Sequence, residues 1–158
     1  MKKILVFLSS VVILFLLSWY MYNDSLHDEV LNNSNNPFGT KEIHPATIEQ
    51  LNDPNYQNII VPKDLEKKLN QDTDVTVYFY SPTCKPCKET TPIVVPMAKD
   101  LGINLFQFNL LEYENSWEDY GVIFTPTTIH FQKGKEIMRI AGYQSSESYL
   151  NFFSTLAK

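Results

Sequence analysis

Two cysteines that lie three positions apart are the side chains in this sequence whose spacing most directly suggests chemistry. Cys84 and Cys87 are the only cysteines among 158 residues, and chance would give this spacing in only about one case in eighty. On a helix, residues i and i+3 face the same side, close enough for a disulfide. The pair can therefore be a redox-active dithiol, a structural disulfide or part of a metal site.

The residues before the pair favour ionisation of Cys84. Residues 75–80 (VTVYFY) are β-branched and aromatic, which predicts a strand buried on both faces. Residues 81–83 (SPT) form a natural turn after it. A helix that begins near Cys84 would direct the positive end of its dipole and its unpaired amides at the sulfur.

Three neighbouring residues are expected to tune the pair. Lys85 and Lys88 add positive charge, and Pro86 stiffens the first helical turn without needing an N–H donor. We therefore predict that Cys84 is an exposed nucleophile with a pKa below the value of about 8.5 of a free thiol. Cys87, one turn inside the helix, should be shielded and act as the resolving thiol.

The other uses of the pair have less support in the sequence. A disulfide that closes so small a ring removes little chain entropy and would be a weak structural staple. A zinc site needs further ligands, and the paired spacing that would supply them is missing from His27, His44 and His130. We therefore expect no metal site and no cofactor.

The N-terminal residues predict a membrane anchor. Lys2 and Lys3 precede residues 4–23, which carry no charge and would span about 30 Å as a helix, the thickness of a bilayer core. The basic end should face the cytoplasm, so a single pass would place the rest of the chain outside it. The alternative is secretion after signal cleavage, but bulky aromatics at 19–22 stand where a cleavage site needs small residues.

Beyond the anchor, the pattern predicts a tether and one domain. We expect the anchor at 1–23, a flexible tether rich in Asn at 24–54, and an α/β domain at 55–158. Strands that alternate with helices and end in a hairpin and a final helix predict a central mixed sheet flanked by helices. The expected strands are 56–61, 75–80, 103–108, 127–131 and 135–140, and the expected helices are 62–70, 85–101 (interrupted by Pro92 and Pro96), 114–120 and 145–156.

The charge balance argues against nucleic acid as a partner. The chain has 13 basic and 18 acidic residues. Without Lys2 and Lys3, 11 basic residues remain, so the chain beyond residue 23 carries a net charge of −7. A protein that binds nucleic acid would instead present a basic patch to the phosphates.

Two segments together resemble the thioredoxin superfamily. They are residues 77–88 (VYFYSPTCKPCK), followed by Pro92, and residues 120–127 (YGVIFTPT), which look like the family's cis-proline segment. The resemblance covers roughly residues 55–157 and implies a thioredoxin fold. It also implies that Pro126 is the cis-proline and that the backbone of Thr125 pairs with a bound substrate strand.

The same resemblance implies the reaction. Cys84 looks like the attacking cysteine and Cys87 like the resolving one, so protein or peptide thiols and disulfides would be the substrates. With the anchor, the sequence resembles extracytoplasmic thioredoxin-like proteins of bacteria, including bacteriocin transport accessory proteins, which act on exported proteins or peptides. A reductase outside the cytoplasm would also need a membrane redox partner.

Departures from the family keep a second function open. Tyr78 and Gln107 stand where thioredoxins carry a buried Asp and a Lys, and Thr83 stands where they usually carry Trp. Without those charges, water or Glu89 would have to accept the proton of the resolving thiol. The alternative is therefore a non-catalytic accessory module that binds an exported peptide or its transporter.

Overall fold

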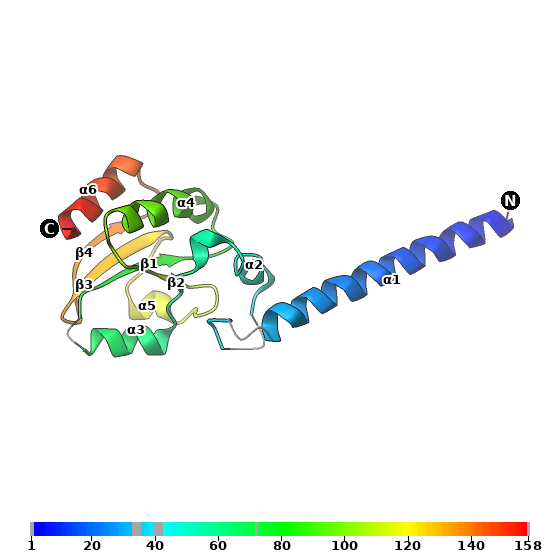
Figure 1. Cartoon of the computed structure of the whole chain (residues 1–158), viewed down its shortest axis with the longest axis horizontal. Coiled ribbons are helices and arrows are strands. Elements are labelled where there is room, and N and C mark those ends of the chain that lie inside the picture. Colours follow the sequence, from blue (N-terminus) through cyan, green and yellow to red (C-terminus); the bar gives the residue numbers. More distant parts are fainter. Residues whose placement is uncertain (1, 33–35, 40–42, 72, 158) are drawn as a thin grey trace. The chain divides into compact units, whose positions relative to one another are not determined.

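The computed structural model describes residues 2–32, 36–39, 43–71 and 73–157. The chain divides into two compact units, Met1–Glu42 and Ile43–Lys158, which are coloured along the sequence in Figure 1. Residues 43–54, which the sequence analysis assigned to the tether, therefore belong to the second unit. Residues 33–35 and 40–42 of the predicted tether lie outside the described residues.

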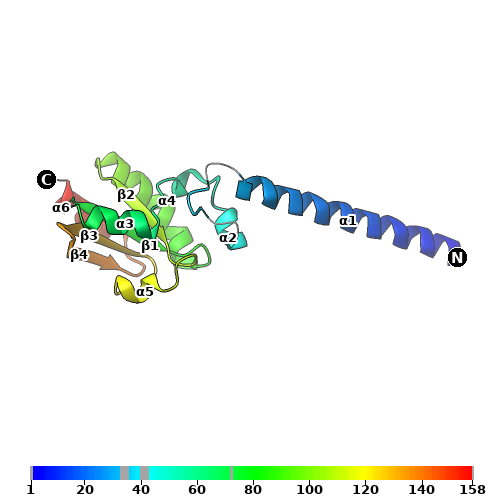
Figure 2. The ribbon, with the colours of Figure 1, turned by 90° about the horizontal axis from the view of Figure 1, so that it is seen from below.

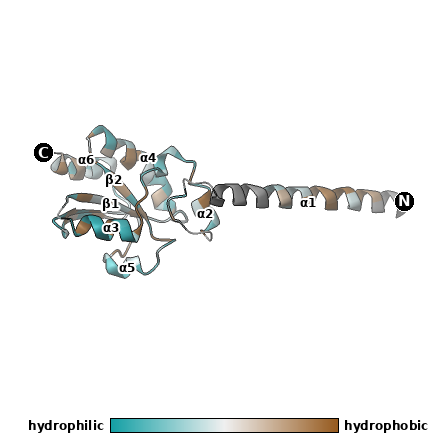
Figure 3. Cartoon of the chain, turned by 60° about the horizontal axis from the view of Figure 1, so that its bottom comes forward, coloured by the Kyte–Doolittle hydropathy of each residue, from teal (hydrophilic) through white to brown (hydrophobic). Residues whose placement is uncertain are grey.

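The first unit contains the helix α1 (Lys2–Asn32). Residues 2–32 contain neither Pro nor Gly, so nothing in this stretch breaks the helix, and it continues past the predicted end of the anchor. The side chains of residues 7–22 are exposed, and Figure 3 shows hydrophobic residues along this stretch. Within the described part of the chain, however, no helix combines the length and apolarity that crossing a membrane requires. The membrane span stays a prediction.

The second unit is built around a mixed sheet, as predicted. In the described residues its strand order is β2-β1-β3-β4. β1 pairs in parallel with β2, antiparallel β3 lies on its other side, and β4 pairs antiparallel with β3. The strands are β1 (Val75–Tyr80), β2 (Leu105–Asn109), β3 (Thr127–Gln132) and β4 (Lys135–Ala141).

Helices cover both faces of this sheet. Figures 1 and 2 show α4 (Lys85–Asp100) and α6 (Ser146–Leu156) on one face, with α3 (Pro62–Leu69) and α5 (Ser116–Asp119) on the other. The short helical turns α2 (Pro45–Ile48) and η1 (Pro54–Tyr56) precede α3.

Alternation along β1 divides the core between the two faces. Tyr78 and Tyr80 pack in the cluster under α4 and α6, while Val77 and Phe79 pack in the cluster on the other face. All six residues of β1 are buried, which confirms the prediction of a strand covered on both sides.

The hairpin between β3 and β4 depends on its turn. Lys133 and Gly134 have positive φ angles of 50° and 73°, as a tight hairpin turn requires. A Cβ atom at Gly134 would lie 2.7 Å from the carbonyl oxygen of Leu69. Only glycine fits this position, as its place in the predicted turn suggested.

The predicted strand at 56–61 is wrong. Tyr56 ends η1, and among the described residues Ile59 forms only an isolated parallel bridge with Gln107. The Gln107 side chain explains this, because its Oε1 accepts from the Asn58 N–H at 3.1 Å and its Nε2 donates to the Asn55 carbonyl oxygen at 2.6 Å. The Gln107 side chain thus occupies the Asn58 N–H, a backbone group that a longer strand would pair with β2.

The expected interruption of the active-site helix is also absent from the described residues. α4 runs continuously from Lys85 to Asp100 and contains both Pro92 and Pro96. The prolines are four residues apart, so they share one face of the helix, and both are exposed. Carbonyl groups that lose their partner on this face can bond to water, which lets the helix continue.

Candidate active site

Cys84 lies where β1 gives way to α4. It is the N-cap residue of α4, with φ −77° and ψ 113°, and its Sγ accepts a hydrogen bond from the Cys87 N–H at 3.2 Å. The turn before it is closed by the Cys84 N–H, which donates to the Ser81 carbonyl oxygen at 3.1 Å. The fold therefore holds this sulfur over the positive end of the helix dipole, where a thiolate is favoured.

The two cysteines form a disulfide with a Cα–Cα distance of 5.3 Å. Cys84 is partly exposed, whereas Cys87 is fully buried. A substrate sulfur can therefore reach Cys84 but not Cys87. This difference in access agrees with the predicted roles of attacking and resolving thiol.

The predicted substrate-binding residues lie against Cys84. The carbonyl oxygen of Thr125 is 3.4 Å from Cys84 Sγ, although the residues are 41 positions apart. The Thr125–Pro126 peptide bond is cis, as the resemblance implied. The Pro126 carbonyl oxygen accepts from the Gly142 N–H at 2.7 Å, which joins this loop to the segment after β4.

Large apolar side chains on the two loops next to the disulfide are exposed, a feature that the sequence analysis missed. Ile123 and Phe124, directly before Thr125, are 77% and 65% exposed, and Tyr143, directly after Gly142, is 61% exposed. Their place between predicted elements was visible in the sequence, but their exposure was not.

The three predicted tuning residues lie on the surface. Lys85, Pro86 and Lys88 are all exposed in the first turns of α4. Solvent screens the two ammonium charges there. The helix N-terminus is therefore the larger influence on Cys84, and the lysines add a smaller one.

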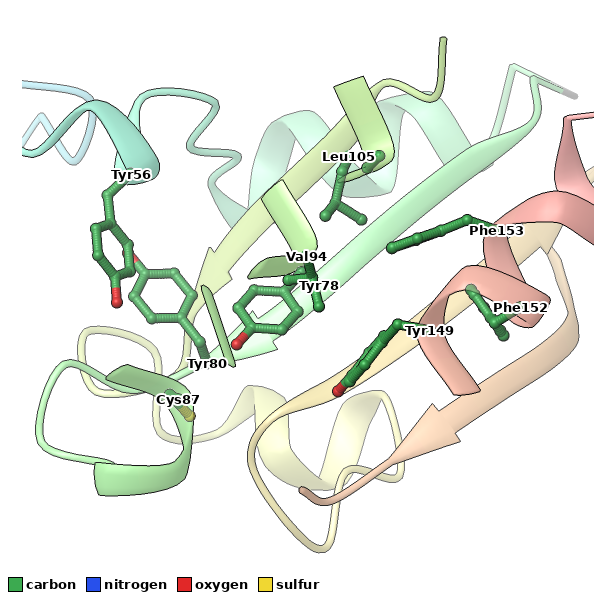
Figure 4. Close-up of a cluster of buried hydrophobic side chains, with 10 residues drawn as sticks. Tyr56, Tyr78, Tyr80, Cys87, Val94, Leu105, Tyr149, Phe152 and Phe153 are labelled. Carbon is green, nitrogen blue, oxygen red and sulfur yellow. The ribbon is translucent and has the colours of Figure 1, made fainter. Parts of the chain in front are cut away.

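Cys87 is fully buried in a core cluster that is rich in tyrosines (Figure 4). The Thr91 hydroxyl donates to the Cys87 carbonyl oxygen at 2.7 Å, and the Tyr78 hydroxyl lies 3.1 Å from the Thr91 oxygen. The sequence analysis did not identify Thr91, although its position four residues after Cys87 on a helix places both on one face. The buried cluster around Cys87 comprises Tyr56, Tyr78, Tyr80, Val94, Ala98, Leu105, Tyr149, Phe152 and Phe153.

The tyrosines of this cluster are neutral at ordinary pH. Burial raises the pKa of Tyr78 and of Tyr80 far above the usual value, and it raises the pKa of Tyr149 to about 12. A phenol in this state can donate a hydrogen bond but does not accept a proton as a base would. Tyr78 therefore does not replace a carboxylate in removing the Cys87 proton.

The other residue that departs from the expected pattern is structural. Gln107 is fully buried and binds the backbone at Asn55 and Asn58, so it connects the segment before α3 to β2. Glu89, the carboxylate proposed as a proton acceptor, is exposed on α4. In the described residues, no group of three or more His, Cys, Asp or Glu side chains could hold a metal ion.

Comparison with known proteins decides the family. The thioredoxin family matches residues 56–155, which include the disulfide, the cis-proline and all but the last residue of the final helix. The chain belongs to the thioredoxin family. Members of this family are thiol–disulfide oxidoreductases, and this chain, with its Cys-x-x-Cys pair, is one as well.

Individual relatives cover the same part of the chain. A thioredoxin of Rickettsia conorii is 29% identical over 100 residues, which are 61% of this chain and 95% of the relative. A thioredoxin of Rickettsia felis is 31% identical over 88 residues, which are 54% of this chain and 84% of the relative. The solved structure of Fasciola hepatica thioredoxin is similar with a TM-score of 0.55 at 27% identity, covering 64% of this chain and 99% of that one. The matched residues thus span most of the length of each of these three proteins.

Proposed function

We propose that this oxidoreductase exchanges disulfides with exported proteins or peptides outside the cytoplasmic membrane. The observation that carries the exchange chemistry is the Cys84–Cys87 disulfide, whose partly exposed sulfur lies beside the Thr125 carbonyl oxygen. A substrate strand that pairs with the backbone at Thr125 would bring its own sulfur next to Cys84.

In the reducing direction, the Cys84 thiolate attacks one sulfur of the substrate disulfide. The substrate S–S bond breaks, and the second substrate sulfur leaves as a thiolate that takes a proton from water. Cys87 then loses its proton and attacks Cys84 Sγ, which breaks the mixed disulfide and releases the first substrate sulfur. Two electrons pass from the cysteine pair to the substrate, and oxidation of a substrate runs the same steps in reverse.

The direction of exchange is set by the redox potential. Lys85 favours the thiolate and therefore the reduced pair, which makes the disulfide more oxidising, whereas Pro86 resembles the reducing members of the family. We propose an enzyme dedicated to one substrate rather than a general reductase. Equilibration with glutathione measures this potential. A standard potential of about −120 mV would identify an oxidant, and one of about −270 mV a reductant that needs a membrane redox partner.

The location rests on the first residues of the sequence. Lys2 and Lys3 ahead of the uncharged residues 4–23 support a single-pass anchor with its N-terminus in the cytoplasm. Protease added to intact cells should then digest the thioredoxin domain. A domain that is digested only after the cells are broken would contradict the location and leave the exchange chemistry untouched.

The resemblance to extracytoplasmic thioredoxin-like proteins supports the proposed class of substrate. Extracytoplasmic thioredoxin-like proteins, among them bacteriocin transport accessory proteins, share the combination of an anchor and this domain, so an exported peptide is the substrate that we propose. The non-catalytic alternative finds no support in the site, since the cysteines are paired and one of them is accessible.

Substitution of each cysteine tests the proposed roles. Cys84→Ser should abolish reduction of a peptide disulfide, because the attacking sulfur is gone. Cys87→Ser should accumulate a mixed disulfide with the substrate, because the resolving sulfur is gone. Mixed disulfides that form through Cys87 in the Cys84 variant would contradict the assignment. Mass spectrometry of the complexes trapped in intact cells would also identify the substrate.

A further inference from the structure

A single arginine connects β4 to the loop that contacts Cys84. Among the 13 basic residues of the chain, Arg139 is the only arginine. Its Nη1 donates to the Gly121 carbonyl oxygen at 2.7 Å, and its Nη2 donates to the Tyr120 carbonyl oxygen at 3.2 Å. No pattern in the sequence predicts a role for this residue, although it stands alone among twelve lysines.

A carboxylate on the same strand fixes the orientation of the guanidinium group. Arg139 Nε donates to Glu136 Oε1 at 2.6 Å, and Nη2 binds the other oxygen of the same carboxylate. The pair is about one-third exposed on each side, so its charge attraction is partly screened. Its geometry matters more, because a planar guanidinium can bind a carboxylate at one edge and two carbonyl groups with its other N–H groups, which a lysine cannot.

The register of the sheet explains how Arg139 reaches this loop. Arg139 lies opposite Ile129 in the β3–β4 pair, and Ile129 belongs to the core on the α3 and α5 face. Opposed residues in an antiparallel pair share a face, so Arg139 is directed to the segment that follows α5. Gly121 has a φ angle of 56° there, and this turn opens the loop at residues 120–126.

We propose that Arg139 is a positioning residue for disulfide exchange. It holds the start of the 120–126 loop, and thereby keeps the Thr125 carbonyl oxygen beside Cys84 Sγ, where a substrate strand can pair with it. The other end of the loop is held separately, by the bond from the Gly142 N–H to the Pro126 carbonyl oxygen. Between these two attachments Ile123 and Phe124 are exposed. The Val122 N–H also donates to the Trp117 carbonyl oxygen at 2.8 Å, so loss of Arg139 would loosen the start of the substrate-facing segment rather than release it. The inference rests on the proposed role of Thr125 in binding substrate.

Single-turnover kinetics of the full-length chain test this role. The reduced protein is mixed with increasing concentrations of a peptide that contains one internal disulfide, and the half-saturating concentration and the maximal rate are measured. Reduction of the protein's own disulfide by dithiothreitol is measured in parallel, because this small reagent needs no substrate strand at Thr125. If the unsubstituted protein neither reduces this peptide nor, in its oxidised form, oxidises the reduced peptide, the proposed function fails rather than the role of Arg139.

The variants separate geometry from charge. Arg139→Ala should raise the half-saturating concentration at least about fivefold and leave the dithiothreitol reaction within about twofold. Arg139→Lys should behave like Arg139→Ala, Glu136→Gln should have a smaller effect, and Lys135→Ala, which removes a charge from the same strand, should have none. If Arg139→Ala does not fold, Arg139→Lys carries the test, because it retains the aliphatic chain.

Three outcomes would overturn the proposal. An Arg139→Lys variant with unchanged half-saturation would show that charge alone suffices. Equal losses in the peptide and dithiothreitol reactions would show a general structural role. Unchanged peptide kinetics in Arg139→Ala would show that the loop holds its position without this residue.

Discussion

Cys84 and Cys87 share one disulfide but lie in opposite surroundings. Cys84 is partly exposed, accepts a backbone N–H at the start of α4 and faces a carbonyl oxygen of the 120–126 loop. Cys87, one helical turn further, is fully buried in the core cluster that contains the tyrosines. The first environment is made of backbone dipoles and solvent, and the second of neutral aromatic side chains.

This difference shows how one helical turn can produce two kinds of thiol. A sulfur with amide donors and water around it is stabilised as a thiolate, whereas a sulfur in an apolar interior is stabilised as a thiol. The side chains nearest the buried sulfur do not reverse this, because burial keeps the phenols of Tyr78 and Tyr80 protonated. Among the residues that the structure describes, no charged side chain is buried, so backbone dipoles and access are what favour the predicted attacking role of Cys84.

The largest expected effect is in the alkylation of the reduced protein. Iodoacetamide should modify Cys84 at least about a hundred times faster than Cys87 at pH 7, because access and ionisation both favour Cys84. Peptide mapping by mass spectrometry at short times measures the ratio. Similar rates at the two sulfurs would remove the difference on which the comparison depends.

A second prediction concerns the alkaline stability of the tyrosine cluster. A raised pKa means that the folded protein holds the proton more tightly than the unfolded chain. The resulting stabilisation is complete below pH 10 and is lost as the pH rises through the folded value, which is about 12 for Tyr149. At about 1.4 kcal/mol for each pKa unit, Tyr149 alone should contribute about 3 kcal/mol.

Denaturant unfolding at a series of pH values measures this loss. Tyr149→Phe should flatten the decline between pH 10 and pH 12, because it removes one of the buried phenols. Tyr143→Phe is the matched control, since Tyr143 is exposed. A Tyr149→Phe variant with an unchanged decline would contradict the prediction.

A third prediction concerns the hydrogen bonds behind Cys87. Thr91→Val keeps the shape of the side chain but removes the hydroxyl that bonds to the Cys87 carbonyl oxygen and lies beside the Tyr78 hydroxyl. The loss should be about 1–2 kcal/mol of unfolding free energy, because a buried phenol loses a partner. Urea unfolding measures it.

The matched control is a threonine with a similar bond on the surface. Thr155 donates to the Asn151 carbonyl oxygen at 2.9 Å and is exposed. Thr155→Val should therefore cost less than Thr91→Val. Equal losses of unfolding free energy would mean that the buried hydrogen bonds of Thr91 stabilise the fold no more than an exposed threonine hydrogen bond does.

The smallest expected effect is that of the lysine next to the attacking sulfur. Lys85 is exposed, so Lys85→Gln should change the rate of thiol alkylation at pH 7 by no more than about twofold. A tenfold decrease would mean that side-chain charge, and not the helix N-terminus, sets the acidity of Cys84. The Lys88→Gln variant, one turn further along α4, provides the comparison.

Local signals in the sequence were sufficient for the elements that carry the disulfide. β1 was predicted with its bounds and its burial on both faces, and α4 within one residue at its end. Each signal extends over only a few positions: the β-branched run, the SPT turn at 81–83 and the proline of the first helical turn. The cis-proline followed from the resemblance rather than from physical reasoning.

Such local signals do not predict contacts between segments that are distant in the sequence. The strand expected at 56–61 was replaced by bonds from Gln107, which a pattern of hydrophobic residues does not show. Arg139 and Thr91 were missed because their roles depend on what lies opposite them in the fold. In the last helix, apolarity alone does not show which residues face the core: Leu150 is 44% exposed, since it follows the buried Tyr149 by one position and turns about 100° from it.

The most direct test is the titration of each thiol in the reduced protein. Thiolate absorbance is measured as a function of pH in two single-thiol variants: Cys87→Ser, which retains Cys84, and Cys84→Ser, which retains Cys87. The reference is the pKa of a free thiol, about 8.5. Cys84 should lose its proton below this pH, and Cys87 above it. A Cys84 that ionises at or above that pH, or later than Cys87, would contradict the account.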